Sequence, residues 1–281
     1  MKRRWCKDVL FRWVCGAVSM FATALLLVLL VHLCRQGWEY LDSSFLTQFA
    51  SRRPAQAGIK AGLWGTLWLL ALTATMAFPL GVATALYLEE YAPQGRLTRL
   101  LEVNIANLAG VPSIIYGLLG LAIFVRLLGL ERSLWSGSMT LTLLILPVII
   151  VSAQGAIRSV PRSLREASYA LGAQPWHVNL LVVFPAALPG ILTGVILALS
   201  RAIGETAPLV IVGAVGYMRF VPTSPSDDFT ALPLQIYDWA SRPQVEFHQV
   251  AASGILVLLS ILLMFNLTAV WIRHRLQRYP S

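Results

Sequence analysis

Residues 158–185, RSVPRSLREASYALGAQPWHVNLLVVFP, are the stretch that decides how this chain folds. They carry three arginines and one glutamate, and they separate two apolar runs, 133–157 and 189–214. About 20 residues of helix cross the hydrocarbon layer of a membrane, so each of these runs is long enough to span it. The segment between them is therefore expected to be a short connection at a membrane surface.

The order of turn and capping residues in this connection predicts a first short helix. Pro161 stops the preceding span from simply continuing. Ser163 and Glu166 have the spacing of a capping box, in which each side chain bonds the backbone amide of the other residue. Gly172 supplies a left-handed residue with which the helix can end.

A second short helix is expected to follow and to complete a helical hairpin. Pro175 suits its first turn, and we expect it to end near Phe184-Pro185. The apolar side chains of the first helix exceed what its own two turns can bury. These residues are Leu164, Ala167, Tyr169, Ala170 and Leu171.

The composition of the whole chain is that of a membrane protein. Of 281 residues, 57% are hydrophobic and only 12% are charged, and the mean hydropathy is +0.69. Ordinary soluble domains are about 45–50% apolar and about 25% charged. So few charges cannot cover a globular surface, which excludes a soluble α/β enzyme, a disordered tail and a disulfide scaffold. We predict an all-α polytopic membrane protein.

Six apolar stretches are long enough to be membrane helices. The first follows a basic tail, but it is too long for the apolar region of a cleaved signal and lacks a small-x-small cleavage site. The predicted spans are 13–34, 61–88, 103–125, 133–157, 189–214 and 247–272. The expected organisation is a cytoplasmic tail (1–12), the first membrane helix (13–34), an extracytoplasmic loop (35–60), a five-helix core (61–272) containing the loop 158–185, and a cytoplasmic tail (273–281).

The distribution of Lys and Arg orients these spans. With the N-terminus inside, thirteen of the 22 basic residues fall on the cytoplasmic side and eight fall outside. The remaining one, Arg201, lies within a span. Because cytoplasmic loops carry the excess of positive charge, both termini are predicted to be cytoplasmic.

Arg201 and Glu205 interrupt the fifth apolar run. Four residues apart on a helix, they share a face and can form an ion pair. Pro208 has no amide hydrogen, so it leaves the carbonyl of Gly204 without its helical partner. The pair either holds helices together or presents a cation to a substrate, and we favour the second interpretation because intramembrane ionisable residues usually mark pathways. A guanidinium offers two parallel donors to a tetrahedral oxyanion.

The connecting segment resembles a known sequence pattern. Glu166-Ala167-Ser168, Gly172, Val182 and Phe184-Pro185 are spaced as in the EAA loop of ATP-binding-cassette (ABC) importer permeases. The resemblance implies a MetI-like permease architecture in which this hairpin docks into a groove of an ATPase subunit. The residues expected at that contact are Glu166, Ala167, Ser168, Gly172, Phe184 and Pro185. The alternative is a surface hairpin that merely connects two spans.

The charged pair carries a second resemblance. Arg201-Ala-Ile-Gly-Glu205 is similar to a segment of importers for phosphate, sulfate and molybdate, and the continuation Thr206-Ala-Pro208 resembles the phosphate branch. Segments 104–117 and 231–243 also resemble phosphate importer permeases of the A type. The resemblance implies a substrate pathway at Arg201, Gly204, Glu205, Thr206 and Pro208. A sulfate or molybdate permease is the alternative.

The resemblance also implies the partners of the chain. These are a second, similar but non-identical permease, two ATPase subunits, an extracytoplasmic phosphate-binding protein and the lipid of a bacterial inner membrane. No phosphate-binding Gly-x-x-x-x-Gly-Lys-Ser/Thr loop occurs in the sequence, so ATP and Mg²⁺ are expected on the ATPase and no cofactor on this chain. Neither a metal site nor nucleic-acid binding is expected.

A membrane-embedded transferase is the rival class. It requires acidic or His residues that converge near one interface. The acidic pairs Glu89-Glu90 and Asp227-Asp228 are expected on opposite sides of the membrane, with no basic or His partner nearby. Pro112, Ser113 and Tyr116 interrupt the start of the third span, and we interpret them as a helix boundary rather than a substrate contact.

Overall fold

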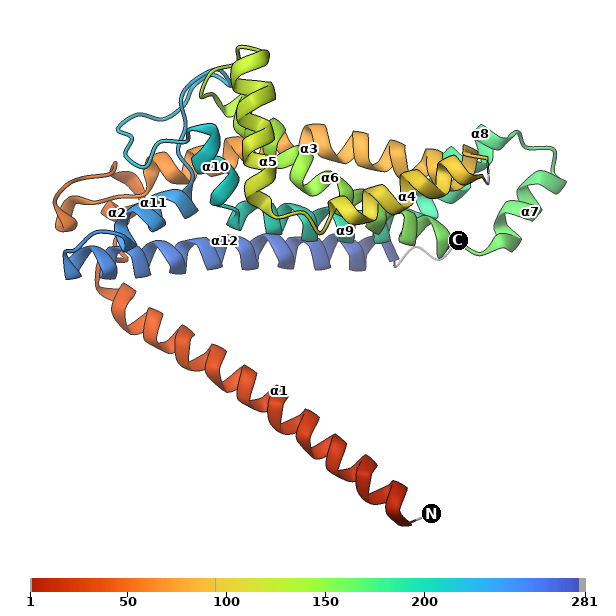
Figure 1. Ribbon diagram of the computed structural model, residues 1–281, viewed down its shortest axis with the longest axis horizontal. Helices are drawn as coiled ribbons and strands as arrows, with labels where there is room; N and C mark the ends of the chain where they lie inside the picture. The colour runs from red at the N-terminus through yellow and green to blue at the C-terminus, as the bar shows by residue number, and fades with distance from the viewer. Residues whose placement is uncertain (1, 94, 278–281) are drawn as a thin grey trace.

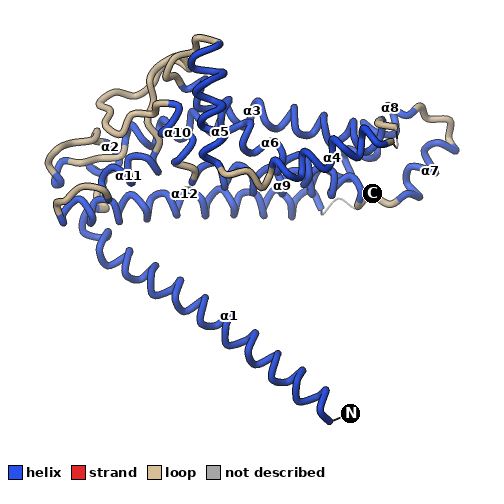
Figure 2. The backbone as a smooth tube through the Cα atoms, in the orientation of Figure 1, coloured by secondary structure: helices blue, strands red, loops and turns tan. Residues whose placement is uncertain are grey.

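Every regular element of the described chain is helical. The computed structural model describes residues 2–93 and 95–277 (Figures 1 and 2). Within those residues, the only β-type pairing is an isolated bridge between Ser133 and Asp228. The predicted all-α class is confirmed. The α-helices are α1 (Lys2–Gly37), α2 (Ser43–Thr47), α3 (Lys60–Leu86), α4 (Arg96–Leu108), α5 (Ser113–Gly120), α6 (Leu134–Arg158), α7 (Arg162–Ala170), α8 (Pro175–Val178), α9 (Phe184–Gly204), α10 (Ala207–Val212), α11 (Leu232–Ala240) and α12 (Val245–Gln277).

Three wider, π-helical turns extend these helices. They are η3 (Tyr87–Tyr91) after α3, η4 (Leu121–Leu127) after α5 and η5 (Asn179–Val183) between α8 and α9. Five helical stretches of the described chain are long and apolar enough to cross a membrane, and a bent pair makes a sixth. The predicted number of spans is thus reached when α4 and α5 are taken together.

The third span, predicted over 103–125 with a helix boundary at Pro112, consists of two helices. Helix α4 ends at Leu108 and α5 begins at Ser113, and the two stretches are bent by 102°. Pro112 lies before α5 with ψ 136°, and a residue in this extended conformation, without an amide hydrogen, cannot continue α4. Figure 1 shows α5 standing across the direction of the long helices. The expected boundary is present, and it bends the span.

Helices α3, α6 and α9 form the centre of the molecule. Ala77, Ile149 and Ile191 come from these three helices and are fully buried in one apolar cluster. The helices approach closely because small residues lie between them: a Cβ on Gly81 would lie 2.5 Å from Cγ2 of Ile149. This three-helix core positions the hairpin between α6 and α9 and the interrupted end of α9.

Helices α1 and α12 lie on the outside of this core. Helix α12 packs beside α9, whereas α1 contacts α12 near Gly37, whose carbonyl accepts a 2.7 Å hydrogen bond from Ser253 Oγ. Over most of its length α1 diverges from the other helices (Figure 1). The described ends of both helices point toward the end of the molecule that carries α7 and α8, as expected if both termini are cytoplasmic.

The opposite end of the molecule is closed by α2, α11 and the loop 35–60. The rings of Phe45 and Trp239 are 6.0 Å apart, and both side chains are buried. The side-chain amide of Gln235 donates a 2.8 Å hydrogen bond to the carbonyl of Gly58. The loop predicted to be extracytoplasmic is therefore packed against the helical core.

Candidate functional site

The fifth predicted span is interrupted at the position of the charged pair. Helix α9 ends at Gly204, Glu205 is extended (φ −78°, ψ 117°), and Thr206 precedes α10, whose first turn contains Pro208. The missing amide hydrogen of Pro208 is the expected cause of such a break. In a membrane, irregular backbone is tolerated where protein covers it or where it lines a cavity.

Arg201 and Glu205 form the predicted pair, and the pair is loose. Nε of Arg201 lies 3.4 Å from Oε1 of Glu205, against about 2.7–2.9 Å for a strong charge-assisted bond. The Arg201 side chain is 46% exposed and makes no other hydrogen bond to the described residues. Both residues belong to one stretch of chain, so within this chain the pair links no second helix. Most of the guanidinium is available to a ligand.

Helix α5 packs directly against this break. A Cβ on Gly117 would lie 2.8 Å from Cα of Pro208, so only a glycine allows the two segments to come this close. Tyr116 is buried, and its hydroxyl donates a 2.8 Å hydrogen bond to the carbonyl of Leu108, across the bend between α4 and α5. Two interrupted spans therefore meet beside Arg201.

Sequence reasoning assigned Tyr116 only to a helix boundary and did not single out Gly117. The signal that would have found them is the occurrence of two proline-interrupted spans in one chain. In transporters such paired interruptions commonly surround the substrate site.

The cytoplasmic hairpin is present, and Gly172 ends its first helix. Gly172 has φ +82°, in the left-handed region, as predicted. Its amide donates to the carbonyl of Tyr169 at 2.9 Å, and the amide of Ala173 donates to that of Ser168 at 3.1 Å. Helix α8 then begins at Pro175.

The predicted capping box is wrong. Pro161 is the residue before the first helical residue, Arg162, and no side chain caps the start of α7. Because the helix begins before Ser163, this serine lies inside the first turn and cannot act as its N-cap. The arginine two positions further on, Arg165, bonds the carbonyls of Ile157 and Val160 at the end of α6 instead.

The predicted end of the second arm at Phe184-Pro185 is also wrong. Helix α8 continues through the π-helical turn η5 into α9, which begins at Phe184 and contains Pro185 in its first turn. A π-helical turn pairs residues five apart and so lets the helix absorb an irregular backbone position. The second arm of the hairpin is therefore continuous with the fifth span.

The exposed face of the hairpin is apolar, as the sequence predicted. Leu171 is 89% exposed, and Leu164, Tyr169 and Trp176 are also exposed. Of the residues expected at the ATPase contact, Glu166, Ala167, Gly172 and Pro185 are exposed, whereas Ser168 and Phe184 are half-buried. Apolar side chains gathered at a water-facing end indicate a surface that a partner covers.

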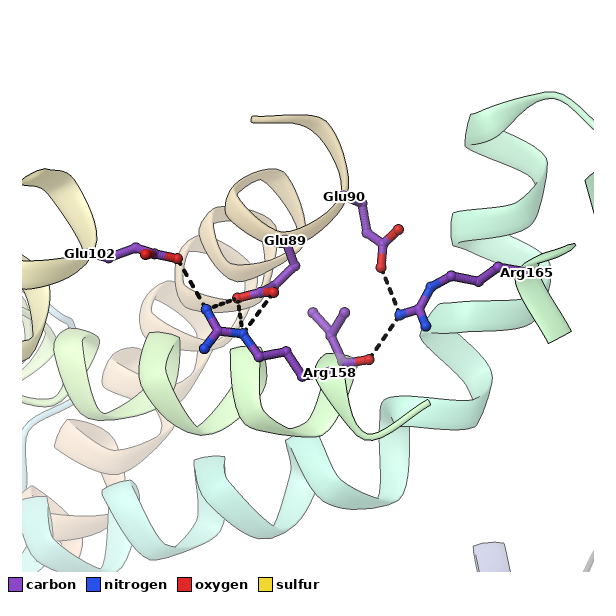
Figure 3. Close-up of polar contacts among 6 residues, drawn as sticks. Glu89, Glu90, Glu102, Arg158 and Arg165 are labelled. Atoms are coloured by element: carbon purple, nitrogen blue, oxygen red, sulfur yellow. Dashed lines mark hydrogen bonds and ion pairs between the residues drawn. The ribbon is translucent and has the colours of Figure 1, made fainter. Parts of the chain in front are cut away.

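Glu89 and Glu90 do have basic partners, which contradicts the sequence interpretation. Glu89 pairs with Arg158 at 2.7 Å, and Glu90 pairs with Arg165 at 2.9 Å (Figure 3). Glu102 also contacts Arg158, at 3.1 Å. The partners lie 69 and 75 residues away along the chain, beyond two further spans. The predicted topology nevertheless places all of them at the cytoplasmic ends of spans, which is the signal that could have found these pairs.

This architecture defines a class of protein, a polytopic transport permease with a cytoplasmic coupling hairpin. The chain belongs to the family of binding-protein-dependent transport system inner membrane components, whose sequence pattern matches residues 77–278. It is a multi-pass inner membrane subunit that is not itself catalytic and binds no cofactor of its own, and it works with an ATPase and a binding protein.

Several curated proteins are similar to this chain over most of its length. The probable ABC transporter permease protein YqgI of Bacillus subtilis is 34% identical over 277 residues, which cover 94% of each chain. The phosphate transport system permease protein PstA 1 of Mycobacterium tuberculosis is 36% identical over 252 residues, 88% of this chain and 79% of that protein.

Solved structures of ABC importers have the same fold. A chain of the inward-facing MetNI methionine transporter matches with a TM-score of 0.65 at 20% identity, covering 77% of this chain and 95% of that one. A chain of a bacterial alginate transporter in complex with its alginate-bound periplasmic protein matches with a TM-score of 0.69 at 16% identity, covering 98% and 99%. The predicted permease architecture is confirmed.

Proposed function

We propose that this chain is a permease subunit of an ATP-driven importer of inorganic phosphate. The observation that carries the proposal is the guanidinium of Arg201, which lies at the break of the fifth span with one loose contact to Glu205. Phosphate at neutral pH is a heavily hydrated, negatively charged oxyanion, and entry into a membrane cavity is costly for it without a cation. Arginine presents paired donors that fit two oxygens of such an anion.

The relatives support phosphate over other oxyanions. Proteins named as phosphate transport system permeases are 36% identical in Mycobacterium tuberculosis and 29% identical in Haemophilus influenzae, over 88% of this chain in each case. A sulfate or molybdate permease is the second candidate, since a guanidinium binds any tetrahedral oxyanion. The specificity is thus the part of the proposal that needs a direct measurement.

The proposed pathway consists of Arg201 and the interrupted backbone beside it. Arg201 contacts the anion, and Glu205 orients the guanidinium from its other side. Gly204, Thr206 and Pro208 form the break, where backbone amides and carbonyls are not consumed by helical hydrogen bonds. No neighbouring atom lies within 4 Å of the position that a Cβ on Gly204 would occupy, which leaves room for a ligand.

The proposed assembly contains two permeases, two ATPase subunits and an extracytoplasmic phosphate-binding protein. The second permease is a similar, non-identical chain. The apolar face of α7 docks on an ATPase through Glu166, Ala167, Ser168 and Gly172, and ATP binding moves this hairpin. Because α8, η5 and α9 form one continuous helical stretch, movement of the hairpin reaches Arg201 directly.

Uptake by the reconstituted complex tests the proposal. The complex of permeases and ATPases is placed in proteoliposomes with the binding protein outside, and ATP-dependent uptake of radiolabelled phosphate is measured. We expect uptake that excess unlabelled phosphate abolishes and that equal excesses of sulfate and molybdate leave intact. Efficient competition by sulfate or molybdate, together with their own ATP-dependent uptake, would replace phosphate by that anion.

A further inference from the structure

Two consecutive acidic residues of η3 are held by arginines from two different elements. Glu89 faces Arg158, at the end of α6, and Glu90 faces Arg165, in α7 (Figure 3). Successive residues of a helix point in different directions around its axis, and here the two carboxylates face different arginines. The end of the second span is thereby tied both to the core and to the hairpin.

Arg165 is the more firmly held of the two arginines. Its Nη1 donates to the carbonyl of Val160 at 2.7 Å, and its Nη2 donates to the carbonyl of Ile157 and to Oε1 of Glu90, both at 2.9 Å. The side chains of Arg165 and Glu90 are only 18% and 12% exposed. An ion pair so shielded from water is screened little by salt, and losing one partner leaves the other charge poorly solvated.

The second pair is more open to water. Nε of Arg158 donates to both carboxylate oxygens of Glu89 at 2.8 and 2.9 Å, and its Nη2 contacts Glu102 of α4 at 3.1 Å. However, the Arg158 side chain is 59% exposed. This pair joins η3 to the end of α6 and to α4, and it makes no hydrogen bond to α7.

Glu90 and Arg165 also share a cleft with the docking face of the hairpin. Glu166, which is expected to contact the ATPase, lines the same cleft of about 590 Å³, as do Glu89, Arg158, Arg162 and Tyr169. Of the two ion pairs in this cleft, only Glu90–Arg165 includes a residue of α7. The residue at the docking contact and the ion pair therefore belong to one surface. A displacement of α7 by an ATPase must either move η3 with it or break the Glu90–Arg165 pair.

We propose that the Glu90–Arg165 pair is a positioning contact that carries movement of the coupling hairpin to the second membrane span. The inference rests on the proposed function in one respect, the docking of α7 on the ATPase. Helix α3, which precedes η3, packs against α6 and α9, so the pair gives the hairpin a second route into the core besides the direct one through α9. With the pair intact, the second and fifth spans move together.

The test is the number of anions transported per ATP hydrolysed by the reconstituted complex. Glu90→Gln removes the charge but leaves both carbonyl bonds of Arg165, so the end of α6 keeps its cap. We expect this variant to assemble with the ATPase and to hydrolyse ATP, while transport per ATP falls roughly three- to tenfold, as a charged bond becomes a neutral one. Glu90→Asp, which keeps the charge at shorter reach, is expected to fall between Glu90→Gln and the wild type.

Two matched variants separate transmission from general damage. Arg162→Gln removes an exposed arginine of the same helix that forms no ion pair with the described residues. Glu89→Gln weakens the neighbouring pair, which lines the same cleft but makes no hydrogen bond or ion pair to α7. Both are expected to keep a transport-to-ATP ratio within twofold of the wild type.

The outcomes are distinct. A wild-type ratio in Glu90→Gln overturns the proposal, and so does an equal loss in Arg162→Gln. If Glu90→Gln does not assemble, the ratio of Glu90→Asp decides by the same criteria. If the wild type transports another oxyanion instead of phosphate, the proposed substrate is wrong, but the ratio is measured with that anion and still tests the pair.

Discussion

Two arginines of this protein are held in opposite ways, one at the cytoplasmic hairpin and one at the break in the fifth span. Arg165 makes three bonds of 2.7, 2.9 and 2.9 Å to its own chain, and its side chain is 18% exposed. Arg201 makes one contact of 3.4 Å, and its side chain is 46% exposed. The sequence around each has an acidic residue nearby, so composition alone does not separate them.

The difference separates a mechanical role from a binding role. An arginine whose donors are engaged by the surrounding chain fixes elements relative to one another and has little left for a ligand. An arginine inside a predicted span with most donors uncommitted is costly to keep, which is why such residues usually mark a pathway. The predictions below test this division, beginning with the residue that is expected to contact the substrate.

Replacing Arg201 has the largest expected effect. In Arg201→Ala the pathway loses its cation, and two charge-assisted hydrogen bonds to the anion are worth about 1.5–3 kcal/mol each. We therefore expect uptake per inserted complex to fall by roughly a hundredfold or more, with the ATPase still associated. The measurement is ATP-dependent phosphate uptake, normalised to the membrane-inserted complex.

Arg201→Lys is the matched control, because it keeps the positive charge but loses the geometry of the guanidinium. A single ammonium cannot present the planar fork, so only partial recovery is expected. If Arg201 served only to hold helices together, Arg201→Ala would lower the amount of protein in the membrane and leave turnover per complex intact. Full transport per complex by Arg201→Ala would end the pathway hypothesis.

Gly172→Val tests the hairpin and is expected to have the second-largest effect. Gly172 has φ +82°, and a β-branched residue in this region costs about 1–2 kcal/mol. No atom lies within 4 Å of the site of an added Cβ, so the strain is in the backbone alone. We expect the end of α7 to be displaced and ATPase association to weaken roughly tenfold.

Gly172→Asn is the control for that variant, because Asn tolerates the left-handed conformation. It is expected to retain most of the ATPase association, measured by co-purification of the subunits. Equal association of the Val and Asn variants with the ATPase would show that the left-handed turn does not set the docking geometry.

Much of the fold was predictable, because a helix that crosses a membrane needs a minimum length of apolar sequence and because turns require particular residues such as Gly and Pro. The apolar runs located the spans, except that the fifth was placed at 189–214, whereas the helical stretch long enough to cross a membrane is Pro175–Gly204. The hairpin was found from Pro161, Gly172 and Pro175. What failed was local detail. The start of α7 was placed on Ser163, although Pro161 already provides an extended residue from which the helix begins at Arg162. The bend of the third span was not predicted, although its boundary at Pro112 was, because hydropathy records length and not direction.

The candidate site was predictable only where its residues are close in sequence. Arg201 and Glu205 are four residues apart, so a helical repeat pairs them. Gly117 approaches Pro208 only after α5 has turned across the long helices, and no local pattern reports that approach. The Glu90–Arg165 pair likewise joins positions 75 residues apart, through the packing of whole helices.

Glu205→Gln is expected to have a smaller effect than either earlier change. Gln keeps an oxygen that can accept from Arg201 but removes the charge, so the guanidinium is less firmly oriented. Because the contact is already long, at 3.4 Å, we expect uptake to fall by less than roughly tenfold. Uptake is measured over a range of phosphate concentrations, with exposed Glu246→Gln as the control. A loss as complete as that of Arg201→Ala would give Glu205 a direct part in handling the anion.

The smallest expected effect concerns Asp227, a charged residue in the outer loop. Like Arg165, it is hydrogen-bonded by neighbouring groups of its own chain. Oδ2 of Asp227 accepts hydrogen bonds from the amides of Ser224 and Thr223, at 2.9 and 2.8 Å, and from the Thr223 hydroxyl at 3.1 Å. These bonds, those from the backbone foremost, lower the pKa of Asp227 below its ordinary value.

A lowered pKa in the folded state means that the carboxylate stabilises the loop above the ordinary pKa of Asp, and that this stabilisation is lost as the pH falls through the lowered value. Hydrogen exchange of residues 223–228 in the detergent-solubilised complex should therefore show protection factors that persist below the ordinary Asp pKa and decline only at still lower pH.

Asp227→Asn should reduce that protection a few-fold at neutral pH, remove its pH dependence and leave uptake within twofold of the wild type. Asp228→Asn, whose side chain accepts no hydrogen bond from the described residues, should keep the wild-type profile. A large loss of uptake in Asp227→Asn would contradict the division drawn from Arg165 and Arg201, because a charge satisfied by its own chain would then be acting on the substrate.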